Sequence, residues 1–341
     1  MTDEQLRVAV VGAGIMGTDH IERLATRTKG AVVAAIVEPD ESRAAAAAAL
    51  APGAVLHPRI EDALDDGGID AVLIATPGPF HTAVLLPALE AGLAVLCEKP
   101  LAPTVDEALQ VLEAEQRLPT PRIQVGFMRR FDAEYAALES LARSGEAGEL
   151  LLLHCAHRNP SVADAYTASM TITDSVVHEL DVVPWLAGAG IGAIEVRTGR
   201  RNRASRFADP QMVLLELENG VLADVEISVN AGFGYQVTTE AVFERGVAGI
   251  GRAGGLVLAQ DGRIGVAEHR SYTTRFAAAY DTEVQRWVDA ARLGGIDGPS
   301  AWEGYRVAVA SAAGVEAQRS GRRVELAAAT PPPFYRDAHR P

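Results

Sequence analysis

The segment from Leu6 to Gly17 reads LRVAVVGAGIMG and decides the fold. Its apolar run VAVV is typical of a parallel strand that is buried on both faces. Gly12, Gly14 and Gly17 follow with G-x-G-x-x-G spacing, and a helix is predicted over 18–28. In a dinucleotide site the first glycine permits a tight turn, the second lets a pyrophosphate approach the backbone, and the third lets the helix pack on the strand. The anion would then lie at a helix N-terminus, where N–H groups are unpaired.

This spacing can arise by chance in a chain with 32 glycines, as a turn that binds nothing. Its context favours a site, because the motif follows a strand and opens a helix. A second predicted strand, AVVAAIV over 31–37, ends next to Glu38. That position is about 20 residues beyond the last glycine, where an acidic side chain binds the ribose hydroxyls. We therefore interpret the segment as a dinucleotide-binding site.

Length and composition indicate the class of protein. A chain of 341 residues is expected to form about two domains. Its apolar runs are too short to span a bilayer and the MTDEQ start lacks signal-peptide features, so we expect a cytoplasmic protein without a membrane partner. A formal charge of −14 argues against nucleic acid. Cys97 and Cys155 belong to no metal-ligand or C-x-x-C pattern. Metal binding by the acidic and histidine side chains over 174–181 is an option, but nothing else supplies a convincing ligand set, so no metal is expected.

The first third of the chain alternates strands and helices. Further strands are predicted over 55–56, 71–75, 94–97 and 122–126, and helices over 41–50, 61–65, 80–91 and 104–116. Such alternation predicts an α/β fold with a doubly wound parallel sheet over 1–126, whose ligands lie at the carboxyl ends of the strands.

Beyond residue 126 the pattern changes. Helices are predicted over 133–144, 174–186, 276–293 and 301–320, with a strand over 150–157. Alternating segments separated by Asn-Gly and Asp-Gly turns fill 194–266 and predict a large mixed or antiparallel sheet. We expect a second domain over 127–330 and an irregular, proline-rich tail over 331–341.

Three groups of residues are candidates for chemistry. Lys99 follows the predicted strand 94–97, where it would reach a ligand or simply be a surface lysine. Asp174, His178 and Asp181 share one stripe of a predicted helix at about 100° per residue. This stripe indicates an imidazole tuned by carboxylates, although a solvated face with a local Asp–His contact is the alternative. In the third group, GFMRRFD over 126–132, the two arginines would bind hydroxyls or a carboxylate, or lie at a domain interface.

Several segments together resemble the Gfo/Idh/MocA oxidoreductases, a family named for glucose–fructose oxidoreductase and inositol dehydrogenase. They are VGAGIMGTDH, ATPGPFH, EKPL, GFMRRFD, HRNP, DSVVHELD and GPSAWEGYRVAVA. GFMRRFD, HRNP and DSVVHELD are most similar to the bacterial myo-inositol 2-dehydrogenase branch. The resemblance implies a Rossmann domain, a second α/β domain whose open sheet often mediates assembly into a homotetramer, and NAD as cofactor.

The resemblance also assigns residues to roles. It implies a catalytic triad of Lys99, Asp174 and His178. The residues expected to bind the substrate are Met128, Arg129, His157, Asn159, Asp181 and Tyr235. Those expected to bind the cofactor are Gly12, Gly14, Ile15, Met16, Gly17, Glu38, Thr76, Pro77, His81, Glu98 and Lys99.

These assignments predict NAD-dependent oxidation of a secondary hydroxyl of a cyclic polyol to a ketone, with myo-inositol to scyllo-inosose as the leading reaction. His178 would take the hydroxyl proton, Lys99 would stabilise the same oxygen, and Asp174 would orient the pair. Other inositols such as scyllo-inositol, or an aldopyranose such as glucose, are alternative substrates. A non-catalytic dinucleotide-binding sensor is the alternative from another class.

Overall fold

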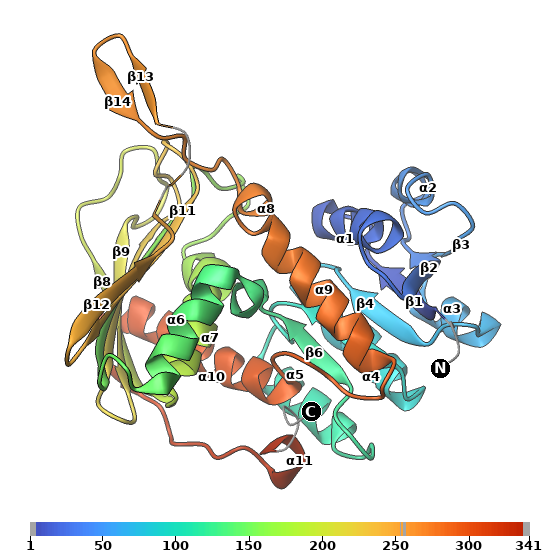
Figure 1. Cartoon of the computed structure of the whole chain (residues 1–341). Helices are drawn as coiled ribbons and strands as arrows, with labels where there is room; N and C mark the ends of the chain where they lie inside the picture. The colour runs from blue at the N-terminus through green and yellow to red at the C-terminus, as the bar shows by residue number, and fades with distance from the viewer. Residues whose placement is uncertain (1–4, 253, 255–256, 337–341) are drawn as a thin grey trace. The chain divides into compact units, whose positions relative to one another are not determined.

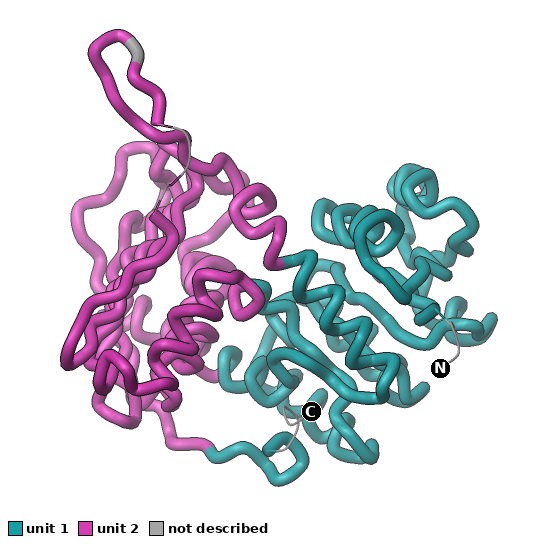
Figure 2. The backbone as a smooth tube through the Cα atoms, in the orientation of Figure 1, with its two compact units in different colours: residues 1–128, 280–308, 330–341 teal, residues 129–279, 309–329 magenta. Residues whose placement is uncertain are grey.

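The computed structural model describes residues 5–252, 254 and 257–336. The chain forms two compact units (Figure 2). Unit 1 comprises Met1–Met128, Tyr280–Ala308 and Thr330–Pro341, and unit 2 comprises Arg129–Ala279 and Val309–Ala329. The sequence predicted contiguous domains, and that division is corrected here because two later segments pack with the first unit.

Unit 1 contains the predicted parallel sheet, with strand order β3-β2-β1-β4-β5-β6 in the described residues. The strands are β1 (Leu6–Val11), β2 (Ala31–Val37), β3 (Val55–His57), β4 (Ala71–Ile74), β5 (Ala94–Glu98) and β6 (Ile123–Gly126). Every neighbouring pair is parallel. The order reverses next to β1, and a ligand crevice forms at the carboxyl ends of the strands at such a reversal.

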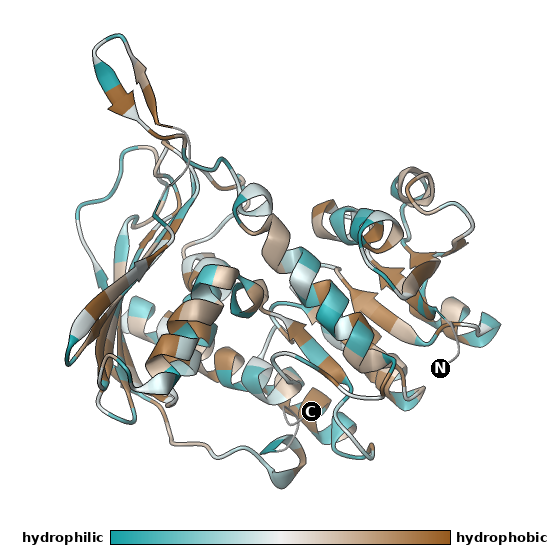
Figure 3. Cartoon of the chain, viewed as in Figure 1, coloured by the Kyte–Doolittle hydropathy of each residue, from teal (hydrophilic) through white to brown (hydrophobic). Residues whose placement is uncertain are grey.

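Helices cover both faces of this sheet (Figure 1). The helices of this unit are α1 (Ile15–Thr26), α2 (Glu41–Ala48), α3 (Ile60–Asp66), α4 (His81–Glu90), α5 (Val105–Glu115), most of α9 (Ala277–Ala291), and α11 (Pro333–Arg336). Val8 and Val10 of β1 pack with Ile21 of α1 and Trp287 of α9 in one buried core. Figure 3 shows β1 and β4 as strongly apolar strands, as expected of strands that are buried on both faces.

Unit 2 contains a seven-stranded mixed sheet of order β12-β11-β7-β10-β9-β8-β15, which confirms the predicted sheet type. Its strands are β7 (Leu150–Arg158), β8 (Ile191–Thr198), β9 (Gln211–Leu217), β10 (Leu222–Ser228), β11 (Gln236–Phe243), β12 (Gly246–Ile250) and β15 (Val324–Glu325). Among the described strands of this sheet, only the β7–β10 pair is parallel. A separate hairpin, β13 (Leu258–Gln260) and β14 (Arg263–Gly265), projects beyond the sheet (Figure 1).

The helices of unit 2 lie against one face of its sheet (Figure 1). They include α6 (Ala133–Ser144), α7 (Val177–Ala187), α8 (Tyr272–Arg275) and α10 (Ala301–Ser320), which enters from unit 1. Asp132 caps α6 by accepting hydrogen bonds from the backbone N–H groups of Glu134 and Tyr135. Alternation along β7 turns Leu153, Cys155 and His157 toward the buried face.

Two predictions about local structure are corrected. The sequence predicted a regular helix from Asp174, but a π-helical turn over Thr171–Val176 precedes α7. Such turns occur frequently at functional sites, and periodicity at 100° per residue cannot reveal them. The tail predicted as irregular contains α11, because Tyr335 is buried and its hydroxyl donates to Glu115 at 2.7 Å. Residues 337–341 lie outside the described residues. Among those that are described, no helix is both long and apolar enough to cross a membrane.

Candidate active site

The glycine turn after β1 has the geometry of a dinucleotide site. Gly12 has φ +93°, and a Cβ there would lie 2.9 Å from the backbone of Ala75 and Thr76. A Cβ on Gly17 would lie 1.8 Å from the Gly12 carbonyl oxygen, so only glycine lets α1 begin this close to the strand. Around Gly14 there is nothing within 4 Å of the added carbon. The turn therefore leaves open backbone at the N-terminus of α1, where a pyrophosphate binds.

Glu38 lies directly after β2, beside this turn. Its carboxylate accepts hydrogen bonds from the backbone N–H of Ala13 at 2.8 Å and from the Arg43 guanidinium at 2.8 Å. Burial opposes ionisation, but these donors outweigh it and lower the pKa of Glu38. The carboxylate is thus held as a fixed anion at the position that binds ribose hydroxyls in dinucleotide sites.

Other predicted cofactor residues surround the ends of β1 and β4. Ile15 is 79% exposed at the start of α1, next to the partly buried Met16. Thr76, which precedes Pro77, has a buried hydroxyl without a hydrogen-bond partner among the described residues. An open turn, a fixed carboxylate and an unused hydroxyl fit a dinucleotide.

His81, another residue predicted to bind the cofactor, lies between two backbone carbonyl groups. Its side chain is fully buried, with Nδ1 2.6 Å from the Pro100 carbonyl oxygen and Nε2 2.9 Å from the Thr76 carbonyl oxygen. Burial lowers the pKa of His81, and a neutral ring donates to one of these oxygens at a time. His81 therefore ties together the loops that follow β4 and β5, beside the predicted cofactor site.

Lys99 follows the last residue of β5, as predicted. The preceding carboxylate, Glu98, is buried and accepts a hydrogen bond from His20 Nε2 at 2.7 Å. This places Lys99 at the carboxyl end of an inner strand, at the end of the sheet where the glycine turn lies.

In unit 2, two predicted substrate-binding residues, Arg129 and His157, form a buried cluster with Glu179. Arg129 and Glu179 form an ion pair in which each side chain is 1% exposed. His157 Nδ1 lies 3.2 Å from Arg129 Nη2 and 3.2 Å from Glu179 Oε2. An arginine only donates and a carboxylate only accepts, so Nδ1 serves one partner at a time and is engaged by the cluster in either tautomer.

The electrostatics of this cluster follow from its burial. Desolvation opposes the charge on Glu179, yet Arg129 and His157 outweigh it and lower the pKa of Glu179 to about 2. The same carboxylate raises the pKa of Arg129 against the effect of burial. Burial raises the pKa of Tyr235 to about 12, so this phenol keeps its proton. The cluster thus keeps Glu179 as an anion and Arg129 as a cation in the interior of unit 2.

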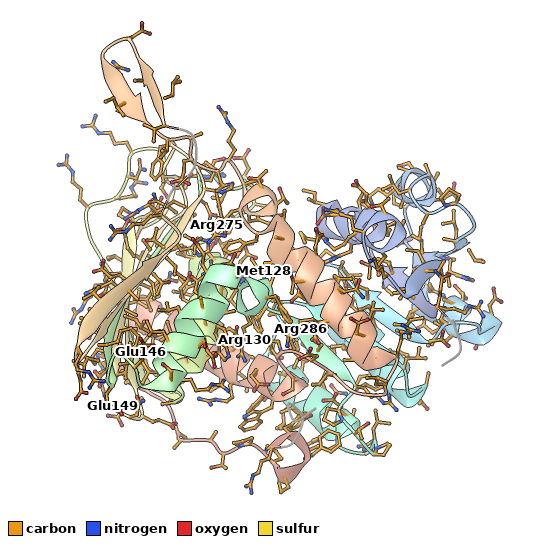
Figure 4. All side chains as sticks on the ribbon, in the orientation of Figure 1. Met128, Arg130, Glu146, Glu149, Arg275 and Arg286 are labelled. Atoms are coloured by element: carbon orange, nitrogen blue, oxygen red, sulfur yellow. The ribbon has the colours of Figure 1, made fainter. Side chains whose placement is uncertain are left out.

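Arg130 engages Asp181 in the same way. Its Nε donates to Asp181 Oδ2 at 2.9 Å, and its Nη2 donates to Oδ1 at 2.5 Å. Arg130, labelled in Figure 4, comes from the turn before α6, whereas Asp181 belongs to α7. Asp181, predicted to bind substrate, is therefore a partner of Arg130, a pairing that the helix stripe did not reveal.

Other predicted catalytic and substrate-binding residues of unit 2 lie near His157. The His178 ring is 6.2 Å from the His157 ring, and the Tyr235 ring is 5.9 Å from it. Asn159 follows β7, and its amide donates to Ser175 Oγ at 3.3 Å in the π-helical turn that carries Asp174. Unit 2 thus brings together His157, His178 and Tyr235, with Asn159 tied to the turn of Asp174. Met128 is buried as the last residue of the first segment of unit 1.

Glu179 and the pairing of Arg130 were missed by the sequence analysis. The sequence did contain a signal for Glu179. Its spacing of three residues from Val176 and four from Val183 places this acidic residue next to the apolar side chains of the same helix. A carboxylate on a buried helix face requires a buried cation or several donors. Glu98 was predicted to bind the cofactor, but its pairing with His20 was not foreseen.

Comparison with known proteins agrees with this geometry. A family model described as an oxidoreductase family with an NAD-binding Rossmann fold matches residues 6–127, and a GFO/IDH/MocA C-terminal domain model matches residues 135–248. The chain is 56% identical over 335 residues to an inositol 2-dehydrogenase of Corynebacterium glutamicum, covering 97% of this chain and 99% of that one. It is 58% identical over 337 residues to an inositol 2-dehydrogenase of Leifsonia xyli subsp. xyli, covering 98% and 99%.

Solved structures are similar over nearly the whole chain. The crystal structure of myo-inositol dehydrogenase from Lactobacillus casei, in complex with NAD(H) and myo-inositol, has a TM-score of 0.94 at 34% identity and covers 97% of this chain and 100% of that one. The apo scyllo-inositol dehydrogenase from the same organism has a TM-score of 0.88 at 25% identity, covering 95% and 99%. The chain therefore belongs to the GFO/IDH/MocA family of oxidoreductases, whose N-terminal domain is an NAD-binding Rossmann fold.

Proposed function

We propose that this protein is an NAD-dependent dehydrogenase that oxidises a secondary hydroxyl of an inositol to a ketone, with myo-inositol to scyllo-inosose as the reaction. One observation carries this proposal: 56–58% identity over 97–98% of the chain to inositol 2-dehydrogenases. The glycine turn and the carboxylate of Glu38 support the cofactor, and the polar cluster of unit 2 supports a polyol substrate.

The proposed mechanism gives each of three residues its own role. His178 accepts the proton of the reacting hydroxyl as general base. Lys99 donates a hydrogen bond to the same oxygen and stabilises its developing negative charge. Asp174 orients His178. When bound, NAD supplies the acceptor for the hydride that leaves the carbinol carbon, so the products are a ketone, NADH and a proton.

Recognition of the polyol is assigned to residues with side-chain donors and acceptors. They are Arg129, His157, Asn159, Asp181 and Tyr235, together with Met128. A site built from such groups rejects an analogue that lacks one hydroxyl, because buried polar groups would lose their partners. The buried partners of Arg129 and Asp181 support the rigidity that this discrimination needs.

Turnover of a polyol panel tests the proposal. Purified protein is mixed with NAD and with myo-inositol, scyllo-inositol or glucose, and NADH formation is followed by absorbance. We expect the highest kcat/KM with myo-inositol. A preference for scyllo-inositol or glucose would reassign the substrate, and NAD binding without turnover of any polyol would favour a non-catalytic sensor.

We further propose that the protein acts in the cytoplasm as a homotetramer. An NAD-dependent reaction uses the cell's NAD pool, and both cysteines are free, buried thiols. The face of the large sheet opposite α6 and α7 carries Leu214 and Leu222, 38% and 50% exposed, beside the ion pair of His154 and Asp224. This mixture of apolar and paired polar groups suits an interface between copies. Light scattering on the purified protein distinguishes a tetramer from a monomer.

A further inference from the structure

A chain of polar side chains, all buried except the partly exposed Asp281, crosses unit 1 from α9 to the end of β5. Asp281 Oδ1 accepts a hydrogen bond from Arg23 Nε at 2.7 Å, and Arg23 Nη1 lies 3.2 Å from His20 Nδ1. His20 Nε2 lies 2.7 Å from Glu98 Oε1. His20 is fully buried, and Arg23 and Glu98 are 2% and 8% exposed. Buried polar groups of this kind are costly unless every contact is made.

The direction of the hydrogen bonds along this chain follows from Arg23. A guanidinium can only donate, so His20 Nδ1 accepts from Arg23. A neutral His20 then carries its proton on Nε2 and donates it to Glu98. The chain thus runs from the Asp281 anion through Arg23 and the imidazole to the Glu98 carboxylate, without a conflict between donors.

Packing fixes this arrangement. The Tyr280 ring lies edge-on to the His20 ring, with 5.9 Å between the ring centroids. The Arg23 guanidinium lies over the Tyr280 ring, 5.3 Å from its centroid. On the far side, a Cβ on Gly126 would lie 3.1 Å from Glu98 Cα and 3.2 Å from Glu98 Oε2. The absence of a side chain at Gly126 therefore leaves the space that the Glu98 carboxylate fills.

The residue after Lys99 is tethered as well. The Pro100 carbonyl oxygen lies 2.6 Å from Nδ1 of the fully buried His81. Lys99 consequently lies between two residues that are each held by a buried histidine. One of these histidines belongs to α1, the helix that begins at the glycine turn.

We propose that His20 and Glu98 are positioning residues for Lys99, and that their hydrogen bond fixes the end of β5 relative to the cofactor-binding helix. The proposal rests on the proposed catalytic function of Lys99. Positioning of this kind matters because a shift of about 1 Å in a reacting group can cost about 100-fold in rate. His20 and Glu98 act through the lysine and need no contact with the substrate.

Single variants of the full-length protein give the first test. We expect His20→Ala and Glu98→Ala to lower kcat by about 10- to 100-fold, and His20→Ala to change the Kd for NAD by less than about 3-fold. Glu98→Gln keeps an oxygen that accepts from His20 Nε2, so we expect it to restore kcat to within about 3-fold of the wild type. His57→Ala, which removes another buried histidine of unit 1 at the end of β3, is the matched control and should keep wild-type kcat. Equal losses in Glu98→Gln and Glu98→Ala would overturn the proposal.

Gly126→Ala provides a second route if the alanine variants fold poorly. It removes no polar group but displaces the Glu98 carboxylate, so kcat should fall while NAD binding is kept. Wild-type kcat in a folded Gly126→Ala protein whose Glu98 has moved would contradict the proposal.

A double-mutant cycle separates positioning from a structural role. If His20 acts through Lys99, the kcat of the double variant His20→Ala/Lys99→Ala should lie within about 3-fold of the kcat of Lys99→Ala. If the loss of kcat in the double variant equals the product of the two single losses, His20 acts independently of Lys99. That result would overturn this inference but not the proposed catalytic role of Lys99. If Lys99→Ala itself kept wild-type turnover, the catalytic assignment of Lys99 and this inference would both fall.

Discussion

The guanidinium of Arg129 and the carboxylate of Glu179 form an ion pair in the interior of unit 2, where both side chains are 1% exposed. Arg129 lies in the turn before α6, and Glu179 lies in α7 next to His178. Arg130 pairs with Asp181 on the same helix. Two consecutive arginines therefore hold α7 through side chains one and three residues after His178, the residue proposed as general base.

Breaking the buried pair should be costly. Glu179→Gln leaves the charge of Arg129 buried without its anion, which we expect to lower the free energy of unfolding by about 3–5 kcal/mol. Urea unfolding followed by tryptophan fluorescence measures this loss. The control is Arg143→Gln, which removes the pair of Arg143 with Glu139 on α6, where Arg143 is 77% exposed. It should cost less than about 1 kcal/mol. Equal costs in the two variants would show that the buried pair has no special energetic role.

The same carboxylate should make stability depend on acid pH. The pKa of Glu179 is lowered from 4.5 to about 2, so its contribution is present above pH 4.5 and is lost as the pH falls toward 2. This shift corresponds to about 3 kcal/mol of free energy of unfolding. Urea unfolding at a series of pH values should show a smaller decline in Glu179→Gln than in the wild type. Parallel declines in the two proteins would contradict the assignment.

Glu38 should set the choice between NAD and NADP. Its buried carboxylate is held by Ala13 and Arg43, and a 2′-phosphate placed there would face a like charge. We expect a clear preference for NAD in the wild type. Glu38→Gln removes the charge and frees Arg43, so the ratio of kcat/KM values for NAD and NADP should fall at least about 10-fold, or about 1.4 kcal/mol. Comparable efficiency with both cofactors in the wild type would refute this prediction.

Asn159 should affect the polyol and not the cofactor. Its amide is tied to Ser175 Oγ at 3.3 Å, next to the turn that carries Asp174. Asn159→Ala is expected to lower kcat/KM for myo-inositol about 10-fold or more, since a buried polar site loses a partner for a hydroxyl. NADH affinity should stay nearly unchanged by fluorescence titration. Asn219→Ala, in the turn between β9 and β10, is the control. An equal loss of NADH affinity would place Asn159 in the fold or the cofactor site instead.

The fold was predictable where local sequence carries the information. Uninterrupted apolar runs and glycine spacing indicated β1 and the turn after it. The bounds predicted for the helices over 133–144 and 301–320 agree with those of α6 and α10. Capping supports this agreement at α6, where Asp132 precedes the helix and Gly145 follows it in a left-handed conformation.

The parts that could not be predicted depend on contacts between distant residues. The helix stripe identified Asp174 and His178, but it could not show that Arg130 pairs with Asp181 or that Glu179 pairs with Arg129. The same limit applies to α9, whose Val284 and Trp287 pack into the core of unit 1 more than 150 residues after β6. Amphipathic periodicity shows that a helix has a buried face, but it does not show what covers that face.

The pH dependence of kcat in the wild type and in His178→Ala tests the proposed mechanism most directly. The assay follows NADH formation from myo-inositol at saturating NAD and saturating substrate, and folding of the variant is checked by circular dichroism. Alcohol oxidation requires a neutral base, so kcat of the wild type should rise with pH through the titration of His178. His178→Ala should lower kcat by about 10²- to 10⁴-fold, abolish that rise and leave NAD affinity nearly unchanged. Wild-type turnover with an unchanged pH profile in the folded variant would contradict the account.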